Sequence, residues 1–280
     1  MEKEEKKKLN IIVLADDSDY GTSALRYGGI LAAIFQASLT IVSDFSFSNI
    51  SSKTNHKLND EQLKLSQQFI DNQIEVIVVS DKYTPENIYV FADEVNTIMF
   101  VIGVQKKGKG SLFDLRSAKR FIKPSRLPVM TVGLKLPSSD IFRHVMLPLD
   151  IERQQKEKSL WAGYFSRFYH SQVHVLFSSY KDAFLRKKVK DNVDFTEKLY
   201  QNLEITYELH HLEDEIDNID RFSLEFASTI NATLSVIMMT HYYSLIDRLF
   251  GPKEDAMIAN EQEIPILCIN ERDDLYVLCT

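Results

Sequence analysis

Short apolar runs alternate along the first half of the chain with longer segments whose apolar residues recur at helical spacing. The run at residues 9–15 is continuous, which is typical of a strand buried on both faces, and residues 22–35 then follow the helical period. Strand–helix alternation predicts a parallel sheet with helices on both faces and right-handed crossovers. The strands expected in this half are residues 9–15, 39–42, 75–79, 97–102 and 128–132.

The same order of elements begins again after a Pro- and Ser-containing stretch at residues 134–140. Leu127-Pro128-Val129 in the first half is matched by Ile264-Pro265-Ile266 in the second, which favours a duplication. We therefore predict two domains, residues 1–136 and 141–280, the second with a short apolar extension. The fold class is α/β, with two repeated open five-stranded parallel sheets of Rossmann-like type. The strands expected here are residues 144–150, 173–177, 205–209, 234–238 and 264–269.

Composition narrows the classes of function. The net charge of −7 argues against a general nucleic-acid binder, which is usually basic. Neither of the two cysteines has the spacing of a zinc motif or a disulfide framework. No apolar run approaches the roughly 20 residues of a membrane span, and the charged N-terminal residues lack an apolar signal core. We expect a cytoplasmic protein without membrane or nucleic-acid partners.

Candidate chemistry lies where the first and fourth strands of the first half end. Ligands of open parallel sheets bind at the carboxyl ends of strands, and a Gly-rich turn before a helix suits phosphate. Asp16 follows the first strand, and Ser18 or Asp19 is expected to cap the next helix. The basic, glycine-containing loop at residues 103–110 follows the fourth strand, and Ser111 is expected to cap the helix after it.

Several motifs, in this order and twice over, resemble the universal stress protein family. They are residues 13–18, 100–103 and 127–132 in the first half and residues 146–150, 240–241 and 264–267 in the second. The whole chain resembles a tandem universal stress protein, with two such domains fused. The resemblance implies a non-catalytic stress-response or regulatory protein whose halves pair through their fifth strands.

Family members that bind nucleotides carry a Gly-x2-Gly-x9-Gly-Ser/Thr loop after the fourth strand. Gly103 and Ser117 match this pattern, whereas Lys106 and Arg116 replace the other two glycines. If the loop binds phosphate, side-chain charge must replace part of what backbone amides do. The cofactor implied is ATP, ADP or AMP, bound weakly in the first domain. The candidate binding residues are Ala15, Asp16, Ser18, Gly103, Lys106, Gly108, Lys109, Arg116 and Ser117.

The second site is expected to be degenerate. Met239, Tyr242 and Pro252 stand at its three glycine positions, and their side chains prevent close backbone approach to a phosphate. Its remaining candidate residues are Asp150, Thr240 and His241.

We predict no catalytic residues and no metal site. The pair His210-His211 precedes an acidic run, but neighbours on a strand point to opposite faces and serve one metal poorly. Two alternatives stay open: a nucleotide-hydrolysing enzyme of the same fold, and a pure protein-interaction module. The sequence also leaves open whether two chains form a homodimer and which protein is the partner.

Overall fold

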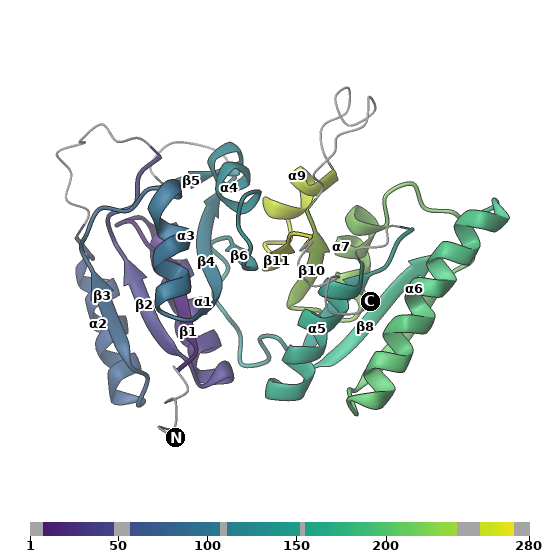
Figure 1. The fold of residues 1–280 in the computed structure, drawn as a ribbon, viewed down its shortest axis with the longest axis horizontal. Coiled ribbons are helices and arrows are strands. Elements are labelled where there is room, and N and C mark those ends of the chain that lie inside the picture. The colour runs from purple at the N-terminus through teal and green to yellow at the C-terminus, as the bar shows by residue number, and fades with distance from the viewer. Residues whose placement is uncertain (1–7, 48–56, 107–110, 152–154, 240–252, 272–280) are drawn as a thin grey trace, which may run out of the picture. The chain divides into compact units, whose positions relative to one another are not determined.

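Two compact units divide the chain, Met1–Leu136 and Pro137–Thr280. The computed structural model describes residues 8–47, 57–106, 111–151, 155–239 and 253–271. Each unit is a parallel sheet with helices on both faces (Figure 1), so the predicted α/β fold class is confirmed.

The sheet of the first unit has the strand order β3-β2-β1-β4-β6, and all these neighbours are parallel. Right-handed crossovers place α1 and α2 on one face and α3 and α4 on the other (Figure 1). Its strands are β1 Asn10–Leu14, β2 Ser38–Val42, β3 Val76–Val79, β4 Thr97–Gln105, β5 Phe113–Asp114 and β6 Val129–Val132. Its helices are α1 Asp19–Phe35, α2 Asp60–Asp71, α3 Pro85–Glu94 and α4 Leu115–Ile122.

Local sequence explains where these helices begin. Ser18 caps α1, because its hydroxyl accepts a hydrogen bond from the Gly21 amide at 3.1 Å, as predicted. Asn59 and Gln62 form a reciprocal capping box at α2. Pro85 occupies the first turn of α3, where its missing N–H costs nothing. Every residue of β1 is buried, as the continuous apolar run indicated.

The second unit repeats this topology with the order β9-β8-β7-β10-β11, again parallel. The matching orders mean that both halves place their first and fourth strands side by side. Its strands are β7 His144–Pro148, β8 Gln172–Ser178, β9 Tyr207–Leu212, β10 Leu234–Met238 and β11 Ile266–Ile269. Its described helices are α5 Gln155–Tyr169, α6 Ala183–Asn202, α7 Ile219–Thr229 and α9 Lys253–Ile258.

Several local predictions are wrong. Gly103 is not in a loop, because β4 continues through it to Gln105. Ser111 does not cap the helix that follows. The N-cap is Asp114, the second residue of the short strand β5, which the sequence did not indicate. In the second unit the third and fifth strands each begin two residues later than predicted, at Tyr207 and Ile266. The apolar extension, residues 274–280, lies outside the described residues.

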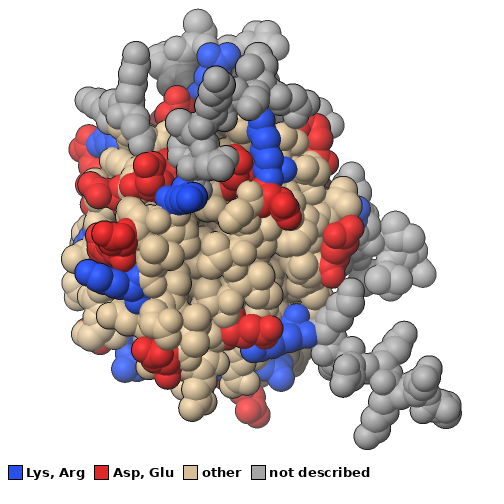
Figure 2. Space-filling model, turned by 90° about the vertical axis from the view of Figure 1, so that its left-hand side faces the viewer, with Lys and Arg blue, Asp and Glu red and all other residues tan. Residues whose placement is uncertain are grey.

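One face of the first unit is largely uncharged. Figure 2 shows a broad area of neutral residues, with most of the charged groups of this view around its margin. None of the described helices is long and apolar enough to cross a membrane. The exposed apolar side chains on α2, β3 and α3 are Leu63, Ile70, Ile77, Val78 and Val90.

Candidate functional site

The carboxylate of Asp16 lies at the carboxyl end of β1, as predicted, but it is bonded within the protein. One oxygen accepts a hydrogen bond from the Ser18 hydroxyl, and the other accepts one from the backbone N–H of Leu112. The side-chain amide of Gln62, which is fully buried on α2, donates to the Asp16 carbonyl at 2.7 Å. Only 7% of Asp16 is exposed, so the group that resembles a nucleotide contact stabilises the turn after β1.

Gly103 lies where β4 passes the beginning of α1. A Cβ atom built at this position would lie 2.1 Å from the carbonyl oxygen of Tyr20, which is a backbone atom. The absence of a side chain therefore allows α1 to pack against β4. This packing accounts for the glycine without any phosphate.

The N-terminus of α4 already carries a negative charge. The carboxylate of Asp114 accepts hydrogen bonds from the Ser117 backbone N–H and hydroxyl, both at 2.7 Å. The backbone hydrogen bond from Ser117 is the main cause that holds the pKa of Asp114 below its usual value, and Arg116 contributes. A helix N-terminus attracts one anion, and here a side-chain carboxylate takes the place that resemblance gives to phosphate.

Five aromatic side chains hold this edge of the sheet in place. We call them the aromatic cluster: Phe45, Tyr89, Phe100, Phe113 and Phe121. Phe121 on α4 packs edge-on against Phe100 at 5.2 Å and Phe45 at 5.5 Å, measured between ring centroids. Phe113 stacks on Phe45 at 5.7 Å and is almost fully buried. Because Phe113 is anchored in this way, the preceding Leu112 N–H is held against Asp16.

The remaining first-unit candidates differ in burial and in what the structure describes of them. The Ala15 backbone N–H donates to the Val42 carbonyl at 3.1 Å, so the strand β2 already satisfies it. Lys106 and Arg116 are exposed cations on either side of the short strand β5. Gly108 and Lys109 lie outside the described residues.

Asp150 after β7 has the same role as Asp16. Its carboxylate accepts hydrogen bonds from the Ile151 N–H at 2.9 Å and from the Tyr180 hydroxyl. Its carbonyl accepts one from the side-chain amide of Asn192 on α6 at 2.7 Å. Gln62 and Asn192 thus have the same role in the two units. In each, a side-chain amide on the second helix donates a hydrogen bond to the turn after the first strand. Thr240 and His241 lie outside the described residues.

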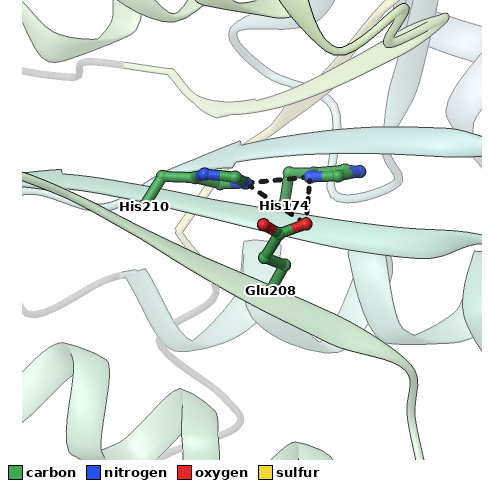
Figure 3. Close-up of side chains that lie close together, drawn as sticks. All are labelled: His174, Glu208 and His210. Carbon is green, nitrogen blue, oxygen red and sulfur yellow. Dashed lines mark hydrogen bonds and ion pairs between the residues drawn. The ribbon is translucent and has the colours of Figure 1, made fainter.

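A second group of polar side chains gathers on β7, β8 and β9, away from the predicted sites. Nδ1 of His174 lies 2.9 Å from Nε2 of His210, and Nε2 of His174 lies 3.0 Å from Nδ1 of His144. Oε2 of Glu208 lies 3.6 Å from Nδ1 of His174 and 3.9 Å from Nε2 of His210. Figure 3 shows the two imidazoles in line, with the Glu208 carboxylate facing both. We call His174, Glu208 and His210 the histidine–glutamate cluster.

No protein-family model matches the sequence, and no curated protein matches it. Solved structures do match the fold. A universal stress protein from Archaeoglobus fulgidus has a TM-score of 0.71 at 14% identity, over 94% of this chain and 98% of that one. The chain has the universal stress protein fold. A putative universal stress protein from Pseudomonas aeruginosa matches with a TM-score of 0.61 at 11% identity, over 98% of this chain and 96% of that one.

A functionally unknown protein from Pseudomonas aeruginosa also matches, with a TM-score of 0.63 at 12% identity over 98% of this chain. All three matches span both units, so the tandem arrangement predicted from the repeated motifs is confirmed as a fold. Within this universal stress protein fold, the strand order brings the ends of β1 and β4 together in each unit.

The sequence did not point to the histidine–glutamate cluster. No metal site was predicted at the His210-His211 pair, because neighbouring side chains on a strand point in opposite directions. His211 does turn the other way, stacking on Phe177 with ring centroids 4.9 Å apart. The register instead places His174 of β8 directly beside Glu208 of β9. The only sequence signal was the spacing of two between Glu208 and His210, which puts both on one face of a strand.

Acid is expected to destabilise the second unit through His174. Burial, with smaller effects from His210 and His144, lowers the pKa of His174 to about 4, whereas Glu208 acts in the opposite direction. The unfolded chain, with a histidine pKa of about 6.5, binds this proton more readily. The contribution of neutral His174 to the free energy of unfolding is therefore fully present above pH 6.5. It is lost as the pH falls toward 4, and the loss is at most about 3 kcal/mol.

Urea unfolding of metal-free protein, followed by fluorescence of Trp161, measures this effect, because the only tryptophan lies in the second unit. A His174→Gln variant controls for the carboxylates that titrate in the same range. The free energy of unfolding should fall less steeply with acid in this variant. Parallel pH curves for the two proteins would contradict the assignment.

Proposed function

We propose that the chain is a non-catalytic regulatory protein of the universal stress protein type. Its first unit binds an adenine nucleotide or another phosphate ligand only weakly. One observation carries the proposal: the carboxylates after β1 and at the start of α4 already accept hydrogen bonds within the protein. Asp16 is bonded to Ser18 and Leu112, and Asp114 occupies the N-terminus of α4. A nucleotide would have to displace these partners.

The positive charge that attracts phosphate here belongs to cationic side chains. Lys106 and Arg116 are exposed. Arg120 lies over the ring of Phe47, 5.2 Å from its centroid. Exposed charges interact weakly in water and are screened by salt. We therefore expect a dissociation constant on the order of 1 mM for ATP.

Calorimetric titration with ATP, ADP and AMP tests the proposal. The expected result is weak heat that disappears at high salt, and no nucleobase absorbance released when the purified protein is denatured. Micromolar binding would contradict the proposal that the existing hydrogen bonds of Asp16 and Asp114 make nucleotide binding weak. Release of phosphate above background, abolished by Asp16→Ala, would favour the alternative of a nucleotide-hydrolysing enzyme.

Replacement of Asp114 by asparagine is expected to strengthen phosphate binding. Asparagine also caps helices well, so α4 should keep its start while the negative charge is removed. Loss of about 1 kcal/mol of repulsion, typical of charges some 4 Å apart in water, corresponds to roughly fivefold tighter binding of ATP. Asp93→Asn, an exposed residue of α3, is the matched control for net charge. Equal affinity in both variants would contradict a role for Asp114 at this site.

The proposal includes pairing of the two halves through their fifth strands, β6 and β11. Within its own unit each of these strands pairs on one side only, among the described strands, so its other side can pair with a further strand. If the halves use these edges on each other, the chain should be monomeric. Light scattering on the full chain measures this, and a stable dimer would instead favour pairing between chains.

A further inference from the structure

The histidine–glutamate cluster has the composition and geometry of a metal site. The three ligand atoms are Nδ1 of His174, Nε2 of His210 and Oε2 of Glu208, and all lie within 4.8 Å of one another. A circle through three atoms separated by 2.9, 3.6 and 3.9 Å has a radius of about 2.0 Å. Zinc–nitrogen and zinc–oxygen bonds are about 2.0–2.2 Å long, so one ion fits between the three atoms without moving the backbone.

We propose that His174, His210 and Glu208 bind one divalent metal ion of the zinc class. Two imidazoles and one carboxylate suit zinc and its neighbours among the transition metals, whereas magnesium and calcium prefer oxygen ligands. The ion would join β9, at one end of the second unit's sheet, to β8. This function goes beyond ligand binding at the ends of β1 and β4.

His144 on β7 supports the site as a positioning residue. Its Nδ1 lies 3.0 Å from Nε2 of His174. A hydrogen bond from the Nε2–H of His174 to this nitrogen leaves Nδ1 of His174 with the lone pair that a metal needs. Metal-bound histidines generally have such a partner on their second ring nitrogen. Without an ion, a proton between His174 and His210 fills the same place.

Exposure at the site allows an ion to enter. His174 is 4% exposed, and the ring of Phe226 on α7 packs against His210 with centroids 4.9 Å apart. Glu208, by contrast, has 53% of its side chain exposed. The two imidazoles are thus held by the protein interior, and the carboxylate faces solvent. Three protein ligands leave the fourth position of a tetrahedral ion to water.

The test uses the full chain, without a polyhistidine tag and stripped of metal by a chelator. Zn²⁺ is titrated in competition with a chromophoric chelator, and Co²⁺ is added separately as a spectroscopic probe. We expect one Zn²⁺ per chain and the visible ligand-field bands of four-coordinate Co²⁺. Zn²⁺ should also raise the urea midpoint seen by Trp161 fluorescence, because a ligand of the folded state stabilises it. Mg²⁺ should change neither signal.

Variants separate this site from other histidines. Glu208→Gln and His210→Gln should each abolish the Co²⁺ bands and weaken Zn²⁺ binding by more than tenfold. His144→Gln should weaken it by roughly 10–100-fold, as expected for an outer partner. His211→Gln, one residue along β9 but on its other face, is the matched control and should bind like the original protein. Absence of stoichiometric Zn²⁺ binding, or binding unchanged in Glu208→Gln and His210→Gln, would overturn the proposal.

Discussion

Phe121→Ala is expected to destabilise the first unit by about 4 kcal/mol. Phe121 is fully buried and packs against the rings of Phe100, Phe113 and Tyr89. Truncation removes its apolar contacts and leaves a cavity that rigid rings cannot close, which typically costs about 3–5 kcal/mol for phenylalanine. Urea unfolding followed by far-UV circular dichroism measures the loss.

The single tryptophan makes this result specific to one unit. Trp161 belongs to α5, so its fluorescence follows the second unit while circular dichroism follows both. The dichroism midpoint should fall markedly in Phe121→Ala, and the fluorescence midpoint should move less. Phe184→Ala is the control, since Phe184 is 65% exposed, and should shift stability by about 0.5 kcal/mol or less. Equal effects of the two variants would contradict the role of the aromatic cluster.

Gly103→Ala is expected to destabilise the first unit by about 3 kcal/mol. The added methyl group would meet the Tyr20 carbonyl at 2.1 Å, well inside any normal contact, and backbone atoms cannot rotate away. Overpacking of this kind typically costs about 1–3 kcal/mol, and a backbone clash lies at the upper end. The measurement is again urea unfolding by circular dichroism.

Gly163→Ala in α5 is the matched contrast. The nearest atom to its added methyl would be Cδ1 of Ile205 at 2.7 Å, the end of a flexible side chain. Alanine is also favoured over glycine inside a helix by about 1 kcal/mol. Gly163→Ala should therefore be close to neutral. A neutral Gly103→Ala would mean that α1 can retreat from β4, and the glycine would then need another explanation.

At the candidate site the sequence predicted the positions of some residues but not their partners. Asp16 and Ser18 lie where the apolar run and the capping pattern placed them, because both signals are local. Their partners are distant: the Leu112 N–H is 96 residues from Asp16, and the Gln62 amide is 46 residues away. The loop pattern alone made Gly103 and Ser117 resemble phosphate ligands. Packing against Tyr20 and capping with Asp114 give each a structural role.

The sequence by itself determined the repeated α/β architecture, because strand and helix periods depend on neighbouring residues along one chain. It determined, for the same reason, which turns follow β1 and β7. Only the tertiary structure decided which groups form hydrogen bonds with those turns. It also decided that three strands bring His144, His174 and His210 together. Cross-strand register creates that proximity, and no spacing along the chain encodes it. The histidine–glutamate cluster, which we propose as a metal site, therefore depends on strand register and not on a sequence motif.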